Sequence, residues 1–162
     1  MLATIQALNV EETETRRRHA ALLVGSDYAD LVSTYRHGGT VGAVVFSRDG
    51  KLALTGSSDQ TARFWRADTG GPVNSPLRHD GTVRAVTFSP NGKLALTGSD
   101  DGTARIWDVS TGKPIGPRLR HQGTVWALAF SPDSTRVLTG SGDRSDCEAL
   151  GCEERRRAEH AP

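Results

Sequence analysis

Three sets of histidine, threonine and aspartate recur along this 162-residue chain, and these residue types could form a hydrolytic active site. Such a site needs a hydroxyl nucleophile, a histidine base and an aspartate that orients the histidine. The sets are His37, Thr55, Asp59; His79, Thr97, Asp101; and His121, Thr139, Asp143. An active site is normally single, however, and each threonine lies in a strand-like "LTGS" segment rather than at a strained, exposed turn. We therefore expect no catalysis, and a hydrolase using a His/Asp/Thr set is the remote alternative.

The two cysteines are the residues that could bind a metal ion. Cys147 and Cys152 are separated by four residues, with glutamates close by and His160 downstream. Structural zinc sites usually show two tight pairs of ligands, and only one loose pair is present. The glycines lie at turns between strand-like runs, so they form neither a phosphate-binding nor a dinucleotide-binding motif. The sequence therefore predicts no metal and no cofactor.

The composition is typical of a globular protein with many turns. Apolar residues make up 36% of the chain and charged residues 24%, with 18 glycines. The formal net charge of +1 argues against nucleic acid as a partner. No run of about 18 apolar residues predicts a membrane span, and the N-terminus lacks the features of a secretory signal. We expect a cytoplasmic protein that does not bind membranes.

The chain repeats with a period of 42 residues, which is the distance from "RHGGTV" at Arg36 to "RHDGTV" at Arg78 and to "RHQGTV" at Arg120. Each copy holds short β-prone runs between turn residues, such as "TVRAVTF", "KLALTGS" and "TARIWDV" in the second copy. Glycine or proline interrupts the sequence too often for a pair of helices. The repeat therefore predicts an all-β unit of four short strands.

Two details of the repeat predict how its strands are arranged. Val83 precedes Val86 by three residues rather than two, which indicates a β-bulge in the first strand. The fourth run contains two prolines in each complete copy, and proline removes a hydrogen-bond donor from the sheet. The fourth strand is therefore expected at the outer edge, where it resists further pairing. These prolines are Pro72 and Pro76, and Pro114 and Pro117.

The stretch "FSPNGKLALTGSDDGTARIWD" resembles a unit of the WD-repeat β-propeller family. Trp107–Asp108 matches the Trp-Asp dipeptide of that family, whereas Arg-His stands where the family usually has Gly-His. In the first copy Trp65 is followed by Arg66 instead of aspartate. The resemblance implies a partial β-propeller of four-stranded antiparallel blades. The expected units are a helical N-terminal extension over 1–35, blades over 36–77 and 78–119, an incomplete blade over 120–143 and a disordered tail over 144–162.

The resemblance also implies a hydrogen-bonded tetrad inside each blade. A threonine hydroxyl can accept the indole N–H and donate to the imidazole, while the carboxylate accepts the second imidazole N–H. In the third copy the tryptophan is missing. The implied sets are His37, Thr55, Asp59, Trp65; His79, Thr97, Asp101, Trp107; and His121, Thr139, Asp143.

Propellers present loops and strand ends on a rigid face, so the resemblance implies a protein-interaction scaffold that binds a protein or a peptide. The copies differ at two surface positions that lie between nearly constant segments. Asp80 and Gln122 follow the Arg-His dipeptide, and Arg84 and Trp126 follow "TV". Arginine and tryptophan are enriched at interaction hot spots. We therefore predict that these four residues contact the partner.

The two ends depart from the repeat. Residues 3–24 contain many helix formers and favourable Glu–Arg pairs four residues apart, so they predict a helix, followed by a short helical or irregular piece over 27–35. After Asp143 the third copy loses its pattern. An incomplete set of blades would leave apolar flanks open, which predicts self-association through the open blade edges. The flank residues are Val44, Phe46, Leu128 and Phe130.

A frameshift would explain why the third copy loses its pattern. One choice of codons for residues 145–154, read one base later, encodes Ala-Thr-Ala-Arg-Leu-Trp-Asp-Ala-Arg, which contains the missing strand signature "TARLWD". The alternative function is therefore a non-functional truncated remnant of a larger propeller protein. Sequencing the gene tests this hypothesis, because the alternative frame must then continue into further repeats.

Overall fold

The computed structural model describes residues 3–8, 31–142 and 148–151, and all of its regular elements there are β-strands. The two complete sheets each have four antiparallel strands that pair in chain order. The first contains β3 (Val41–Phe46), β4 (Leu52–Ser57), β5 (Thr61–Arg66) and β6 (Pro72–Arg78). The second contains β7 (Val83–Phe88), β8 (Leu94–Ser99), β9 (Thr103–Asp108) and β10 (Pro114–Arg120). The predicted all-β architecture with four-stranded antiparallel sheets is confirmed.

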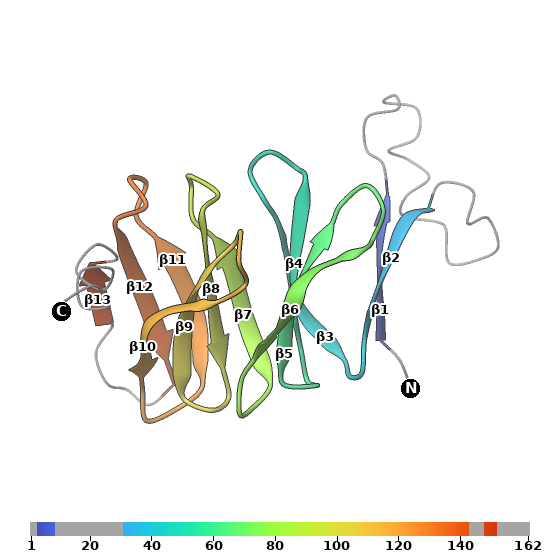
Figure 1. The fold of residues 1–162 in the computed structure, drawn as a ribbon. Coiled ribbons are helices and arrows are strands. Elements are labelled where there is room, and N and C mark those ends of the chain that lie inside the picture. The colour runs from blue at the N-terminus through green and yellow to red at the C-terminus, as the bar shows by residue number, and fades with distance from the viewer. Residues whose placement is uncertain (1–2, 9–30, 143–147, 152–162) are drawn as a thin grey trace, which may run out of the picture.

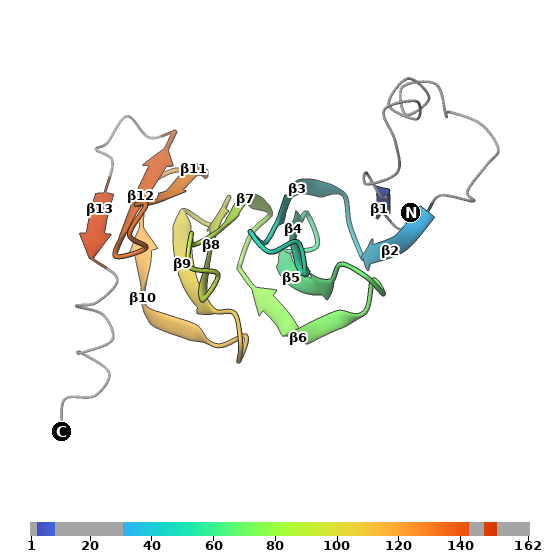
Figure 2. The same ribbon diagram turned by 90° about the horizontal axis from the view of Figure 1, so that it is seen from above.

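Two smaller sheets flank this pair, as Figure 1 shows. On one side β1 (Ala3–Leu8) pairs with β2 (Leu31–His37). On the other side lies a three-stranded sheet of β11 (Val125–Phe130), β12 (Arg136–Ser141) and β13 (Glu148–Gly151). Seen from above, β3, β7 and β11 lie along one side of the molecule and β6 and β10 along the opposite side (Figure 2). The proline-bearing strands β6 and β10 are thus outer edges, as predicted.

The first strand of each repeat carries a bulge at the position predicted from the valine spacing. The pairing of β7 with β8 shifts between Val83 and Ala85, so Arg84 occupies the bulge. The corresponding shifts place Gly42 and Trp126 at the bulges of β3 and β11. A bulge redirects a side chain away from the regular alternation. As a result, the variable residues Gly42, Arg84 and Trp126 lie at the same end of their sheets.

The hydrophobic core lies between the sheets rather than within one of them. Leu54 and Phe64 of the first sheet pack against Phe88 of the second, and the two phenylalanine rings are 5.8 Å apart. Leu96 of the second sheet belongs to an equivalent cluster with Val125 of the third. Each sheet therefore buries both of its faces only when it has a neighbour on each side.

The N-terminal prediction was wrong where the structure describes it. Residues 3–8 form β1 instead of the start of a helix over 3–24, and residues 31–37 form β2 instead of a helical or irregular piece. The rest of the predicted helix, residues 9–30, lies outside the described residues. Helix propensity differs by only a few tenths of a kcal/mol per residue, roughly, between ordinary residues. Six paired positions between β1 and β2 outweigh so weak a local preference.

The C-terminal prediction was also wrong in part, because residues 148–151 of the predicted disordered tail form β13. This strand pairs antiparallel with β12, with Thr139 opposite Glu148. In the two complete sheets the equivalent threonines lie opposite Arg63 and Arg105, eight residues along the chain rather than nine. The edge of β12 offers unpaired backbone groups, and these can bind a strand whose sequence does not match the repeat.

Candidate functional site

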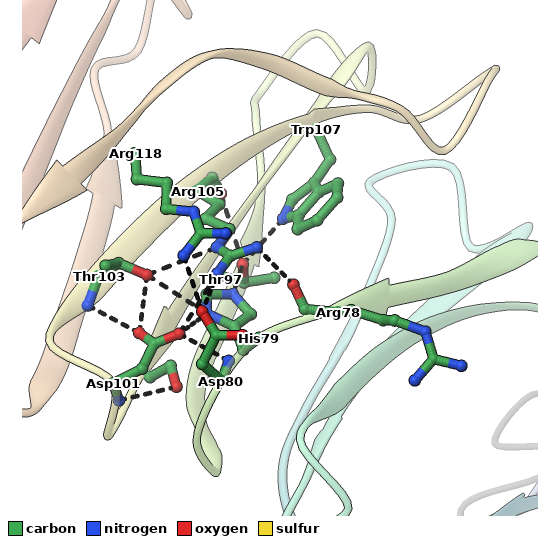
Figure 3. Close-up of polar contacts among 10 residues, drawn as sticks. Arg78, His79, Asp80, Thr97, Asp101, Thr103, Arg105, Trp107 and Arg118 are labelled. Atoms are coloured by element: carbon green, nitrogen blue, oxygen red, sulfur yellow. Dashed lines mark hydrogen bonds and ion pairs between the residues drawn. The ribbon is translucent and has the colours of Figure 1, made fainter.

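A buried hydrogen-bonded network crosses the second sheet from His79 to Trp107. The two ring nitrogens of His79 contact Asp101 Oδ2 at 3.0 Å and Thr97 Oγ1 at 2.7 Å. Trp107 Nε1–H donates to Thr97 Oγ1 at 2.8 Å. Thr103 Oγ1–H donates to the other oxygen of Asp101 at 2.7 Å. The network joins the segment before β7 to β8, to β9 and to the turn between them (Figure 3).

The environment of this network fixes its protonation state. Burial lowers the pKa of His79 to about 4, although the Asp101 carboxylate opposes that change. Burial alone would raise the pKa of Asp101, but hydrogen bonds from Asp80 N–H and Thr103, together with His79, lower it to about 2. At neutral pH the imidazole is therefore neutral and donates Nδ1–H to the carboxylate. Its Nε2 then accepts the hydrogen of Thr97.

The first sheet contains the same network. His37 contacts Thr55 Oγ1 at 2.6 Å and Asp59 Oδ2 at 3.0 Å, and Trp65 Nε1–H donates to Thr55 at 2.8 Å. Burial lowers the pKa of His37 here too. Thr61 donates to Asp59 as its counterpart does in the second sheet.

The third set is only partly brought together. His121 contacts Thr139 at 2.8 Å, whereas Asp143 lies outside the described residues. Thr61 and Thr103 donate hydrogen bonds to the aspartates of the two networks, and the prediction from the sequence did not include them as members. Their signal was present, because Asp-x-Thr occurs at the same place in both complete copies.

The surface at the bulge end of the sheets carries a second, exposed cluster. Arg84 donates from Nε and Nη2 to the Asp100 carboxylate, at 2.9 Å and 2.7 Å. The hydrogen bonds from Arg84 lower the pKa of Asp100, so the pair stays charged. The guanidinium also lies 5.2 Å from the ring centroid of Trp126, in a cation–π contact between neighbouring sheets. Trp126 remains 58% exposed.

Next to this cluster, Asp80 connects two arginines at the surface. Arg118 Nη1 lies 2.7 Å from Asp80 Oδ2, and Arg105 Nη2 lies 3.3 Å from the same oxygen. Arg105 also donates to Arg78 O at 2.7 Å, which holds its planar group over the buried network (Figure 3). We call Asp80, Arg84, Asp100, Arg118 and Trp126 the bulge-end patch.

Three of the four predicted contact residues thus belong to one surface. Asp80, Arg84 and Trp126 are members of the bulge-end patch, and Gln122 is an exposed residue of the loop before β11. The prediction missed Asp100 and Arg118, because their role depends on pairing across the sheet and between strands. Both residues do differ from the other copies, since Ser58 and Gly142 stand at the position of Asp100 and Pro76 stands at that of Arg118.

Two other kinds of site are absent from the part of the chain that the structure describes. No three histidine, cysteine, aspartate or glutamate side chains gather there as a metal site would require. In that same part of the chain, no helix has the length and apolar character needed to cross a membrane.

Comparison with known proteins places these features in a family. The family model described as "WD domain, G-beta repeat" matches three times, at residues 29–66, 70–108 and 112–146. A search of curated proteins gave no significant match.

Solved structures also match, and two of them are computationally designed proteins. The Ika4 protein has a TM-score of 0.67 and 27% identity over 75% of this chain and 72% of its own. The Ika8 protein has a TM-score of 0.66 and 25% identity over 75% of this chain, but over only 36% of its own.

Proposed function

The chain belongs to the WD40 family of β-propeller repeats, and on that premise we propose that it is a protein-interaction scaffold whose bulge-end patch docks a protein or peptide. Members of this family are generally interaction scaffolds and are typically non-catalytic. The family likeness alone says nothing about where a partner would bind. That choice depends on the surface of this particular chain.

The observation that carries the proposal is the Arg84–Trp126 pair. Tryptophan and arginine are enriched among the few residues that supply most of the binding energy at interfaces. A side chain that is held in place before the partner arrives also costs less to order on binding. Arg84 is fixed by its two bonds to Asp100 and stacks over Trp126, yet the indole keeps an open surface. A partner side chain that packs on this indole would lose little conformational freedom on the scaffold side.

The charges of the patch favour a protein partner over a nucleic acid. A phosphate backbone is bound by cations that are free to contact it. Here Arg84 and Arg118 already pair with Asp100 and Asp80, so acidic groups lie among the basic ones. Such a mixed surface suits a polar peptide or protein surface with charges of both signs.

The buried networks have a structural role in this proposal. Thr97 and His79 are almost completely buried, so the hydroxyl cannot reach a substrate carbonyl. Each network instead satisfies polar groups that would otherwise be unpaired inside the sheet. The remote alternative of a His/Asp/Thr hydrolase therefore gains no support from the geometry.

Selection of peptides from a random display library on the immobilised chain tests the proposal. Peptides that bind the patch should bind the Trp126→Ala and Arg84→Ala variants at least about tenfold more weakly, since truncating a hot-spot residue costs about 2 kcal/mol or more and about 1.4 kcal/mol is a factor of ten. Lys93→Ala is the matched control, because Lys93 is exposed in the turn between β7 and β8 at the opposite end of the sheet. Binders weakened by Lys93→Ala but not by the patch variants would contradict the proposal.

A further inference from the structure

The small sheet of β1 and β2 begins in the backbone register of the third and fourth strands of a complete sheet, although its register shifts only between Ala7 and Leu8, later than the shift between Ala62 and Phe64. In the complete sheets Thr61 lies opposite Arg78 and Thr103 opposite Arg120. In the small sheet Thr4 lies opposite Arg36. The family-model matches agree, since each begins shortly before β2, β6 or β10. The pair β1–β2 is therefore the second half of a blade.

The sheet at the other end of the molecule supplies the first half of a blade. Val125 lies opposite Ser141 and Leu128 opposite Thr139, as Val83 lies opposite Ser99 in the second sheet. β11 and β12 thus correspond to the first and second strands. Within the described residues, only β13 extends this sheet. β13 pairs with β12 at four positions, whereas β1 pairs with β2 at six. Half a blade therefore lies at each end of the chain.

The flanks at the two ends expose positions that are buried between the sheets. Phe88 is 9% exposed because it packs on the first sheet, whereas its counterpart Phe46 is 54% exposed. Leu54 and Leu96 are fully buried against the following sheet, whereas their counterpart Leu138 is 46% exposed. The flank of β3 and the flank of β12 are thus the two complementary faces of one repeated interface.

We propose that two copies of this chain assemble head to tail into a closed ring, in which β1–β2 of each copy completes the β11–β12 blade of the other. In this arrangement β1 takes the edge of β12 that β13 occupies in the single chain. Each copy contributes two complete blades and two halves, which amounts to three blades. Two copies make six blades, within the range of about 4 to 8 that propellers use. One copy or three copies would fall outside that range.

A second copy is the occupant that the repeat itself specifies. Inside the chain, a Cβ added to Gly56 or Gly98 would come within 2.8 Å of the valine Cγ1 on the following sheet, Val83 or Val125. The equivalent Gly140 would meet only Ala127 of its own sheet, at 3.2 Å. In the ring, Val41 of the second copy takes the place next to Gly140. Val41 is half-buried in the single chain, whereas Val83 and Val125 are fully buried.

The mass of the full 162-residue chain in solution tests the ring. Analytical ultracentrifugation should find one species at twice the 17.3 kDa of the chain, at concentrations of about 10 μM and above. A monomer over that range would overturn the proposal. An open series of larger species would also overturn it, because a ring of two copies closes and cannot grow. A mass reached only with another protein would show that the flanks serve a different occupant.

A disulfide between copies tests how they join. Leu54 lies opposite Phe64 in the first sheet. Leu138 is the counterpart of Leu54 and Ala7 is the counterpart of Phe64, so the ring places Leu138 of one copy opposite Ala7 of the other. β1 and β12 of one chain lie at opposite sides of the molecule (Figure 2), so this pair cannot join within a copy. The variant Ala7→Cys/Leu138→Cys, with Cys147 and Cys152 changed to serine, should therefore give a covalent dimer under mild oxidation. Absence of that dimer in a variant of native circular dichroism would overturn the strand assignment.

A glycine pair provides the matched control for the interface. Gly140→Ala should weaken association at least about tenfold, because its methyl group would meet Val41 of the second copy as a Gly56 methyl group meets Val83. Gly42→Ala should leave the mass unchanged, since a Cβ at Gly42 has no atom within 4 Å. Equal effects of the two changes would overturn the proposed interface.

Discussion

At the scale of single residues, Thr97 connects the imidazole and the indole of the second network. Its hydroxyl connects His79 and Trp107, both of which are buried. Thr97→Val keeps the shape of the side chain but leaves two buried polar groups without a partner. We expect the free energy of unfolding to fall by about 2 to 4 kcal/mol. Urea unfolding followed by tryptophan fluorescence measures this change.

Thr87→Val is the control for that prediction, because Thr87 is a half-buried threonine of β7 whose hydroxyl makes only a 3.4 Å contact with Phe88 O. It should cost less than about 1 kcal/mol. Similar losses for both variants would mean that the network contributes nothing beyond an ordinary threonine in a strand.

The network also predicts how stability depends on pH. The pKa of His79 is about 4 in the folded chain and 6.5 ordinarily, so between these values the unfolded chain binds more protons. Stability is therefore fully present above about pH 6.5 and is lost as the pH falls toward 4. Between about pH 7 and 5, His79 alone should lower the free energy of unfolding by about 2 kcal/mol. His37 adds a change in the same direction.

Urea midpoints measured at about pH 7, 6 and 5 test this expectation. The variant His79→Gln should show a shallower pH dependence, because one of the two groups that take up protons is gone. The lowered pKa of Asp101, about 2, adds a separate loss below about pH 4 as that carboxylate becomes protonated. A midpoint that stays constant from pH 7 to 5 would contradict the neutral buried imidazole.

At the scale of strands and sheets, the sequence predicted those elements whose pattern recurs. The spacing of Val83 and Val86 indicated the bulge, and the prolines of β6 and β10 indicated the outer edges. β1 and β13 were missed because neither carries a strong strand pattern of its own. β1 becomes a strand by pairing with β2, which is distant in the sequence. β13 becomes a strand by pairing with β12, one residue later along the chain than the repeat would place it. Local propensity contains no information about such a partner.

The close packing between neighbouring sheets predicts the effect of adding one methyl group at Gly98. A Cβ on Gly98 would lie 2.8 Å from Val125 Cγ1 and 2.9 Å from Val125 O, and a backbone oxygen cannot move without its strand. We expect Gly98→Ala to lower the free energy of unfolding by about 1 to 3 kcal/mol. Thermal unfolding by circular dichroism measures the loss, with Gly42→Ala as the tolerated control. Equal stabilities of the two variants would show that the sheets separate more easily than their packing indicates.

At the scale of the whole molecule, the sequence predicted open apolar flanks but not how they could be covered. The prediction named Val44 and Phe46, which are exposed, together with Leu128 and Phe130, which pack in part against the second sheet. It missed Leu138, because its exposure depends on which sheet face lacks a neighbour. It also predicted a helix over most of the N-terminal segment. That segment instead contains the half of a blade that the other end of the chain needs.

The assembly of two copies should make the stability of the chain depend on its concentration. For a dimer that unfolds to two separate chains, a hundredfold increase in concentration stabilises the folded state by about 2.7 kcal/mol per dimer. Urea midpoints measured at about 1 and 100 μM should therefore rise with concentration. Gly140→Ala should remove most of this rise, while Gly42→Ala should keep it. If the midpoint of the unmodified chain is the same at both concentrations, its two half-blades do not meet, and the sheets are stable without closing a ring.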